Sequence, residues 1–230
     1  MLGMERFFKN PFTKSRVGIG PLLAFTTDHV ERLKADNSGG QWTARLAATT
    51  AALAAVNGSF VADQSKLGQR KGSKQTKRMF RRGLAVRLAK IQGAAMGRFG
   101  PKAPELSELF PRGRRGFTQC ADDGLESKLQ ALVTALTAHA AELDAAVVPA
   151  AQTLLAEWRA VYQASEASTG AKASAETARR GARSVLEREL FLNLLTLAQA
   201  FPDAPEKLAR YMQQSLLVKK AGKPGAAPTV

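Results

Sequence analysis

Residues 125–143, which read LESKLQALVTALTAHAAEL, decide the fold class of this chain. The larger apolar side chains advance in steps of three and four residues, at Leu125, Leu129, Leu132, Leu136, Ala140 and Leu143. Such steps place side chains on one face of an α-helix, whereas a half-buried strand alternates every second residue. The stretch therefore predicts an amphipathic helix.

The same helical spacing recurs over residues 42–60, 80–95 and 147–165, where many intervening positions are Ala, a strong helix former. No run shows sustained alternation of β-branched and aromatic residues. We therefore predict an all-α protein. The expected helices cover residues 21–35, 41–64 and 73–98 in the first half, and residues 125–144, 147–166, 174–200 and 205–217 in the second.

Glycine and proline residues mark the expected helix ends. Pro101 and Pro202 stop the third helix of each half, because proline lacks the backbone N–H that a helix interior needs. We also expect a break at residues 68–72, which begin and end with glycine, and another in the Ser, Thr and Gly residues after position 166.

An internal repeat follows from adding 101 to the numbering. The shift places Lys71 on Lys172 and Arg78 on Arg179, and it gives ten identities over residues 71–105. Leu88 then falls opposite Glu189, which leaves open a slip of register inside the helix. The sequence predicts a tandem duplicated antiparallel helical bundle, with three long helices plus one short helix per copy.

Composition divides the chain into five expected segments. They are a basic N-terminal segment over residues 1–19, a basic first helical unit over 20–111, a Gly/Arg-rich linker over 112–123, a charge-neutral second helical unit over 124–218 and a disordered tail over 219–230. The tail prediction follows from its Gly, Pro, Ala and Lys content, which offers no core residues.

Charge is the strongest anomaly of the sequence. Lys and Arg number 34 against 19 acidic residues, which gives a net charge of +15. Residues 1–120 hold 22 of these basic residues and only 7 acidic ones. A concentrated basic surface suits a polyanionic partner, although it can also be a solvated helix face. The candidate polyanion-binding residues are Lys66, Arg70, Lys71, Lys74, Lys77, Arg78, Arg81, Arg82, Arg112, Arg114 and Arg115.

The sequence offers little material for catalysis. One cysteine excludes an intrachain disulfide framework, and two histidines leave little for a metal site. No phosphate-binding glycine motif occurs. Cys120 lies near Arg114 and Arg115, yet no motif supplies the base that a nucleophile needs. We therefore expect a non-enzymatic protein with no catalytic residues, no metal and no cofactor.

The leading interpretation is a helical binding protein that docks a polyanion, nucleic acid first, without sequence specificity. The alternative is a scaffold that binds a protein partner, or a second copy as a homodimer, through an apolar face made of Leu190, Phe191, Leu194, Leu195 and Leu197. An acidic membrane surface is a third partner class. We expect no transmembrane segment, because no run reaches about eighteen uninterrupted apolar residues, and a cytoplasmic location.

Overall fold

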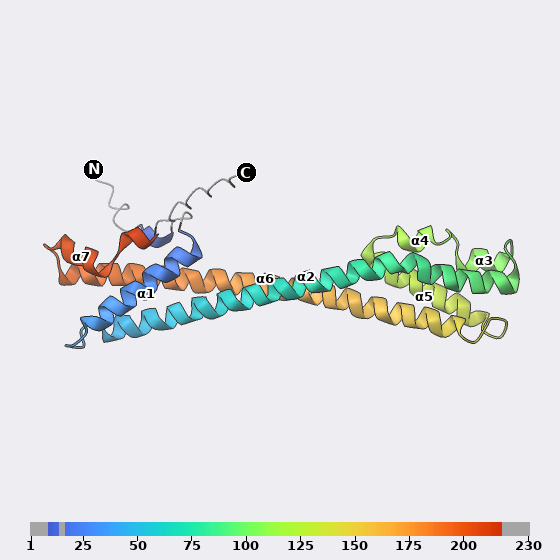
Figure 1. The fold of residues 1–230 in the computed structure, drawn as a ribbon, viewed down its shortest axis with the longest axis horizontal. Helices are drawn as coiled ribbons and strands as arrows, with labels where there is room; N and C mark the ends of the chain where they lie inside the picture. The colour runs from blue at the N-terminus through green and yellow to red at the C-terminus, as the bar shows by residue number, and fades with distance from the viewer. Residues whose placement is uncertain (1–8, 14–16, 218–230) are drawn as a thin grey trace, which may run out of the picture. The chain divides into compact units, whose positions relative to one another are not determined.

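A computed structural model describes residues 9–13 and 17–217 of the chain (Figure 1). The described residues form α-helices and short 3-10 helices and contain no strand, so the predicted all-α class is confirmed. The expected tail over 219–230 and most of the N-terminal segment over 1–19 lie outside the described residues. The elements are η2 (Pro11–Thr13), α1 (Ile19–Ala35), α2 (Thr43–Phe99), α3 (Pro104–Leu109), α4 (Arg115–Thr118), α5 (Asp122–Ala138), α6 (Val147–Ala200), α7 (Pro205–Tyr211) and η3 (Gln214–Leu217).

Two of these helices are much longer than the sequence predicts. Helix α2 has 57 residues and α6 has 54, and each joins two helices that we expected to be separate. The predicted breaks at residues 68–72 and after position 166 are therefore wrong. An interior glycine costs a helix only about 1 kcal/mol, and helix formers such as Gln69 and Arg70 stand between the glycines. Helix α2 ends only at Phe99, just before Gly100, which has a φ of 92° and precedes Pro101.

Helix α2 is also the one described helix that is long and apolar enough, by length and composition, to cross a membrane. In its most apolar stretch 22% of the residues are buried within the protein. The same helix supplies Ala52 and Val56 to a protein core.

Contacts between residues divide the chain into two compact units. Unit 1 combines Met1–Asp63 with Ala175–Val230, and unit 2 is the continuous stretch Gln64–Ser174. This division differs from the expected units over 20–111 and 124–218. It differs because each long helix runs without interruption and contributes one part to each unit.

The core of unit 1 contains side chains from α1, the first part of α2, the last part of α6 and α7. Leu190 and Leu197 are buried in it, and Phe191 and Leu194 pack against it. Leu195 is 43% exposed. Most of the face predicted as a protein interface is thus occupied by packing within unit 1.

A buried polar network also crosses the core of unit 1. His29 Nδ1 lies 2.9 Å from the carbonyl oxygen of Tyr211. Its Nε2 lies 2.9 Å from the side-chain nitrogen of Asn193, which also donates to Thr49 Oγ1 at 2.7 Å. Arg45 Nε donates to Asn193 Oδ1 at 2.7 Å. A carbonyl on one side and an amide donor on the other fix the neutral imidazole, with its proton on Nδ1. Burial lowers the pKa of His29.

The core of unit 2 is almost entirely apolar. It combines the last part of α2, α3, α4, α5 and the first part of α6. Leu84, Leu88, Leu125 and Trp158 are fully buried in it. The ring centroids of Phe80 and Trp158 are 5.3 Å apart. Trp158 therefore serves core packing, in keeping with its place on an apolar stripe.

Candidate anion-binding site

Unit 2 concentrates basic charge on its surface. It contains 18 Lys and Arg against 9 Asp and Glu, a net charge of +9. Six of the cations predicted to bind a polyanion are exposed and form no ion pair with any described residue. We call them the exposed cations: Lys71, Arg78 and Arg82 on α2, and Arg112, Arg114 and Arg115 between α3 and α5.

The three exposed cations of α2 share one face of the helix. At about 100° per residue, Lys71, Arg78 and Arg82 lie within roughly 40° of one another. Leu84 and Ile91 occupy the opposite, buried side. No acidic residue stands four positions before or after any of the three cations, so the helix does not neutralise them.

Lys77 belongs to the same basic run but is already paired. Its Nζ lies 2.9 Å from Asp122 Oδ2 and 3.6 Å from Glu166 Oε1, and 5.5 Å from the ring centroid of Tyr162. The hydrogen bond to Asp122 is the largest cause that raises the pKa of Lys77. This ammonium group is therefore engaged within unit 2.

Arg81 is engaged in the same way. Its guanidinium donates to the backbone carbonyls of Phe117 at 3.3 Å, of Thr118 at 3.5 Å and of Cys120. It also lies 5.8 Å from the ring centroid of Trp158. Three carbonyls from α4 and the residues after it converge on one side chain, so Arg81 fixes this segment to α2.

The remaining predicted cations, Lys66, Arg70 and Lys74, are half-buried. Lys66 Nζ donates to Gln69 Oε1 at 3.1 Å. Unit 2 has three further basic side chains on its surface that the sequence analysis missed. They are Lys90, Arg98 and Lys102, and they form no ion pair with a described residue. They stand singly rather than in a run. The missing acid four positions away is the signal that could have found them.

The segment between α3 and α5 presents its arginines outward because its aromatic rings point inward. Phe110 and Phe117 are buried, with ring centroids 5.8 Å apart. Gly113 turns the chain between them with a φ of 58°, a conformation that favours glycine. At Gly116 a Cβ would lie 3.1 Å from the Cβ of Arg112, so the chain passes close to itself there.

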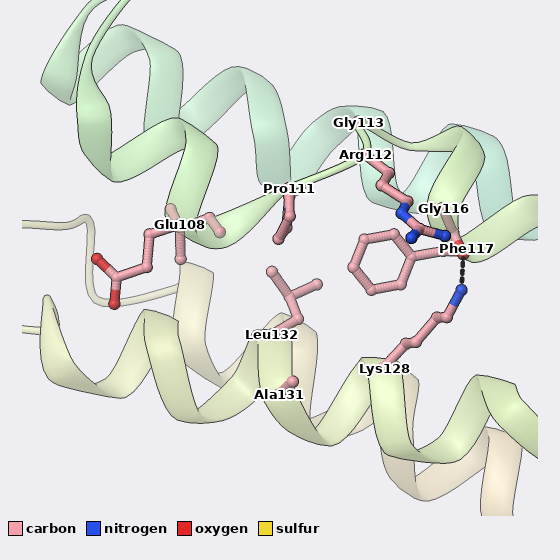
Figure 2. A pocket seen from close by; sticks show the side chains of 10 residues that line it. Glu108, Pro111, Arg112, Gly113, Gly116, Phe117, Lys128, Ala131 and Leu132 are labelled. Carbon is pink, nitrogen blue, oxygen red and sulfur yellow. Dashed lines mark hydrogen bonds between the residues drawn. The ribbon is translucent and has the colours of Figure 1, made fainter.

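An apolar cavity of about 390 Å³ lies beneath this segment. Its lining combines Pro111 and Phe117 on one side with Ala131 and Leu132 of α5 on the other (Figure 2). Leu109 also lines it. Figure 2 places Arg112 and Lys128 at one end of the cavity, beside Gly116, and Glu108 at the other end. The apolar cavity thus has charged groups only at its ends.

A second cavity, also about 390 Å³, adjoins the first. We call it the cationic cavity, because Arg112, Arg115 and Lys128 line it together with Gln119 and Cys120. It shares Arg112, Gly116 and Lys128 with the apolar cavity. Lys128 Nζ donates to the carbonyl oxygen of Gly116 at 2.6 Å, which holds the ammonium group at the junction (Figure 2).

Glu108 is held by an ion pair of its own. His139 Nε2 lies 3.3 Å from Glu108 Oε2, and His139 Nδ1 lies 3.3 Å from Glu142 Oε1. The hydrogen bond to Glu108, followed by that to Glu142, raises the pKa of His139. In the part of the chain that the structure describes, no three His, Cys, Asp or Glu side chains are grouped to hold a metal ion.

The chain matches no protein-family model, and comparisons with curated proteins and with solved structures also find no match. The geometry and charge of the two units are therefore the basis for inferring what the protein does.

Proposed function

We propose that this chain is a non-enzymatic helical binding protein that docks a polyanion, nucleic acid first, through the exposed cations of unit 2. The supporting observation is that six cations without ion-pair partners among the described residues lie on one compact unit of net charge +9. Lysine and arginine contacts to phosphates release condensed counterions and give affinity without sequence readout.

The distribution of acids argues against a merely solvated surface. Asp122 and Glu166 pair with Lys77, and Glu157 pairs with Arg87. These acids neutralise half-buried cations of unit 2, where an unpaired charge would be costly. The exposed cations keep their full charge toward solvent, and with it their capacity to bind phosphate.

The test measures how binding of a short DNA duplex depends on salt. Replacing Lys71, Arg78 and Arg82 by Ala removes three charges from an exposed helix face, so folding is expected to survive. Affinity is measured by fluorescence anisotropy between about 50 and 200 mM salt. The slope of log affinity against log salt should become flatter by about 2.7, or about 0.9 for each phosphate that the variant no longer neutralises.

The matched control removes three exposed cations from unit 1 instead, by replacing Lys34, Arg188 and Lys207 with Ala. Its net charge equals that of the first variant, so a difference between the two locates the binding surface. The slope should stay at the wild-type value. Equal slopes for the two variants, or no binding near 50 mM salt, would overturn the proposal.

A scaffold that binds protein through the 190–197 face has less support. Leu190 and Leu197 are fully buried in unit 1, and Phe191 and Leu194 pack against its core. A partner would find mainly Leu195 on that face.

We also propose that the chain is a tandem duplication, with α1, α2 and α3 corresponding to α5, α6 and α7. Each series has a 17-residue helix, a long helix and a short helix with proline at its start. An offset of 102 pairs the buried Leu84 with Leu186 and Leu88 with Leu190. The buried residues thus support an offset of 102 in this part of the helix, one residue more than the offset of 101 found in the sequence. This difference is the slip of register that the pairing of Leu88 with Glu189 left open.

The first helix of each series supports the same correspondence. An offset of 103 pairs the buried Leu22 of α1 with Leu125 of α5, and the buried Leu33 with Leu136. Short differences in loop length account for offsets that change by one or two residues between elements, because loops tolerate insertions that helices do not.

A further inference from the structure

We propose that the apolar cavity and the cationic cavity of unit 2 form one binding site for a small amphipathic anion, a carboxylate on an unbranched apolar chain. The apolar chain occupies the first cavity, and the carboxylate lies against Arg112, Arg115 and Lys128 in the second. This site is distinct from the cation face of α2 and takes a different class of ligand.

The apolar cavity has the size and lining of a small-molecule site. Such sites measure roughly 300–1,000 Å³ and combine an apolar lining with a few polar groups that fix orientation. Here Leu109, Phe117 and Leu132 supply apolar side chains to the lining, and the small side chain of Ala131 leaves space for a ligand. A cavity of about 390 Å³ admits a short hydrocarbon chain rather than a segment of a macromolecule.

The cationic cavity supplies the head-group contacts. No acidic residue lines it, and Arg112, Arg115 and Lys128 form no ion pair with a described residue. The Lys128 ammonium group uses one donor on the Gly116 carbonyl and keeps two for a ligand. Arginine binds a carboxylate through two parallel hydrogen bonds, so the three side chains together suit a planar anion.

The charged residues at the two ends of the apolar cavity favour a ligand that carries a negative charge at one end only. Arg112 and Lys128 stand at one end, and Glu108 stands at the other (Figure 2). A dianion with a charge at each end of its chain would bring its second charge toward Glu108. A carboxylate with an apolar tail places its one charge beside the cations and leaves the far end uncharged.

Where unit 2 has Lys128 and Arg115, the corresponding positions of unit 1 in the proposed repeat hold apolar residues. At the offset of 103, Lys128 corresponds to Phe25, which is 1% exposed and packs against Phe12. At the offset of 101 that pairs Pro104 of α3 with Pro205 of α7, Arg115 corresponds to Leu216, which packs against the core of unit 1. Protein interiors are normally packed without voids. The change from apolar residues to cations beside a cavity therefore points to a ligand in unit 2.

The first experiment titrates the full chain with hexanoate, octanoate and decanoate by isothermal calorimetry. We expect one saturable site per chain, with affinity rising about fourfold for each added methylene until the cavity is full. Decanol has the same tail without the charge and should bind at least tenfold more weakly than decanoate. Equal affinity for decanol, or no saturable binding of decanoate, would overturn the proposal.

The second experiment locates the site with two variants of exposed residues. Ala131→Trp fills the apolar cavity, and the pair Arg112→Ala with Arg115→Ala removes head-group contacts. Each should weaken decanoate binding more than tenfold, and the pair should leave decanol binding unchanged. Circular dichroism checks that both variants fold. Wild-type affinity for decanoate in both folded variants would sink the proposal.

The control pair, Arg78→Ala with Arg82→Ala, removes the same charge from α2, outside both cavities. It should keep wild-type decanoate affinity, and a loss as large as that of the arginine pair would also contradict the site. Arg112 and Arg115 belong to both proposed sites, but this assay contains no nucleic acid, so its result tests decanoate binding alone.

Discussion

At the scale of single residues, His29 shows how a buried polar group makes folding depend on pH. Its Nε2 accepts a hydrogen bond from Asn193, and the Asn193 amide oxygen is taken by Arg45. A protonated imidazole would turn a second N–H toward an amide that is already donating. Turning the amide over would bring its NH₂ group against the Arg45 guanidinium, so the network has no arrangement that accepts the extra proton.

We expect acid to destabilise the protein through this histidine. The pKa of His29 is lower in the folded chain than the unfolded value of about 6.5, so the unfolded state binds more protons as pH falls below that value. The stabilisation is fully present above about pH 6.5 and is lost as pH falls toward the folded pKa. Once His139, whose effect has the opposite sign, is replaced by Gln, urea denaturation should show a lower midpoint at about pH 5.5 than at about pH 7.5.

The other histidine has the opposite sign and needs to be removed first. The raised pKa of His139 gives stabilisation below about pH 6.5 that is lost as pH rises through its folded value. In a His139→Gln background, adding His29→Leu should abolish the acid loss. It should also lower the free energy of unfolding by about 1–3 kcal/mol for each buried group that loses its hydrogen-bond partner, namely the carbonyl of Tyr211 and the side-chain amide of Asn193. A variant that keeps the full acid loss would assign the pH dependence to another group.

The sequence identifies the cations of unit 2 but not their partners. Lys77 and Arg81 look like the neighbouring Arg78 and Arg82, since all four stand in one basic run. They differ because the fold brings Asp122 and the carbonyls around α4 against one side of α2. Lys128 gives no signal in the sequence, because a lone lysine on an amphipathic helix resembles any solvated charge until a cavity is seen beside it.

At the scale of elements, the long helices show where sequence reasoning about breaks fails. The periodic apolar stripes predict helices on both sides of residues 68–72, and the structure has helix there throughout. Glycine suggests a break in the sequence, but without proline or a positive φ it only weakens a helix. The expected ends at Pro101 and Pro202 are correct, because proline removes a donor and clashes with the preceding turn.

We therefore predict that replacing Gly68 and Gly72 with Ala stabilises the protein. Both lie inside α2, and a Cβ at either position meets nothing within 4 Å. Each substitution should raise the free energy of unfolding by about 0.5–1 kcal/mol, because alanine loses less backbone entropy on folding. Thermal melting followed by circular dichroism measures the gain.

Gly100→Ala is the matched comparison for this element. Its φ of 92° is one that alanine adopts only with strain, so this substitution should lower the melting temperature. If the two glycines within α2 behaved like Gly100, the helix would need their backbone freedom, and the interpretation of α2 as a regular helix at these positions would be wrong.

At the scale of the whole molecule, the proposed repeat and the compact units follow different boundaries. The proposed repeat pairs α1–α2–α3 with α5–α6–α7, whereas unit 2 holds the end of α2 and the start of α6 together with α3, α4 and α5. The sequence pattern predicts the order of elements, because helical periodicity is local. It does not predict the units, because they depend on two helices continuing where breaks were expected.

We predict that residues 64–174 fold as an isolated fragment. The fragment is continuous and contains its own core around Leu88, Leu125 and Trp158. It should show a helical circular dichroism spectrum and a cooperative thermal transition. Residues 1–111 are the comparison, because they hold only parts of each core and should melt without cooperativity. If residues 1–111 melted cooperatively as a monomer while residues 64–174 stayed unfolded, the units expected from the sequence would be favoured instead.

Because unit 1 consists of two separate stretches of the chain, the order in which the nascent chain folds is constrained. Ribosomes deliver the chain from its N-terminus, so residues 64–174 are complete before Ala175–Leu217 have been made. At roughly 5–20 residues per second, α1 then waits a few seconds for the last part of α6.

During that wait we expect unit 2 to be already folded, so residues 64–174 no longer form a flexible loop between the two parts of unit 1. Asp63 and Arg179, which form an ion pair at 3.3 Å, stand on the two stretches of chain that leave it. Closing unit 1 then costs much less chain entropy than joining the ends of an unfolded loop. We therefore expect residues 64–174 to fold first, and the two parts of unit 1 to come together afterwards.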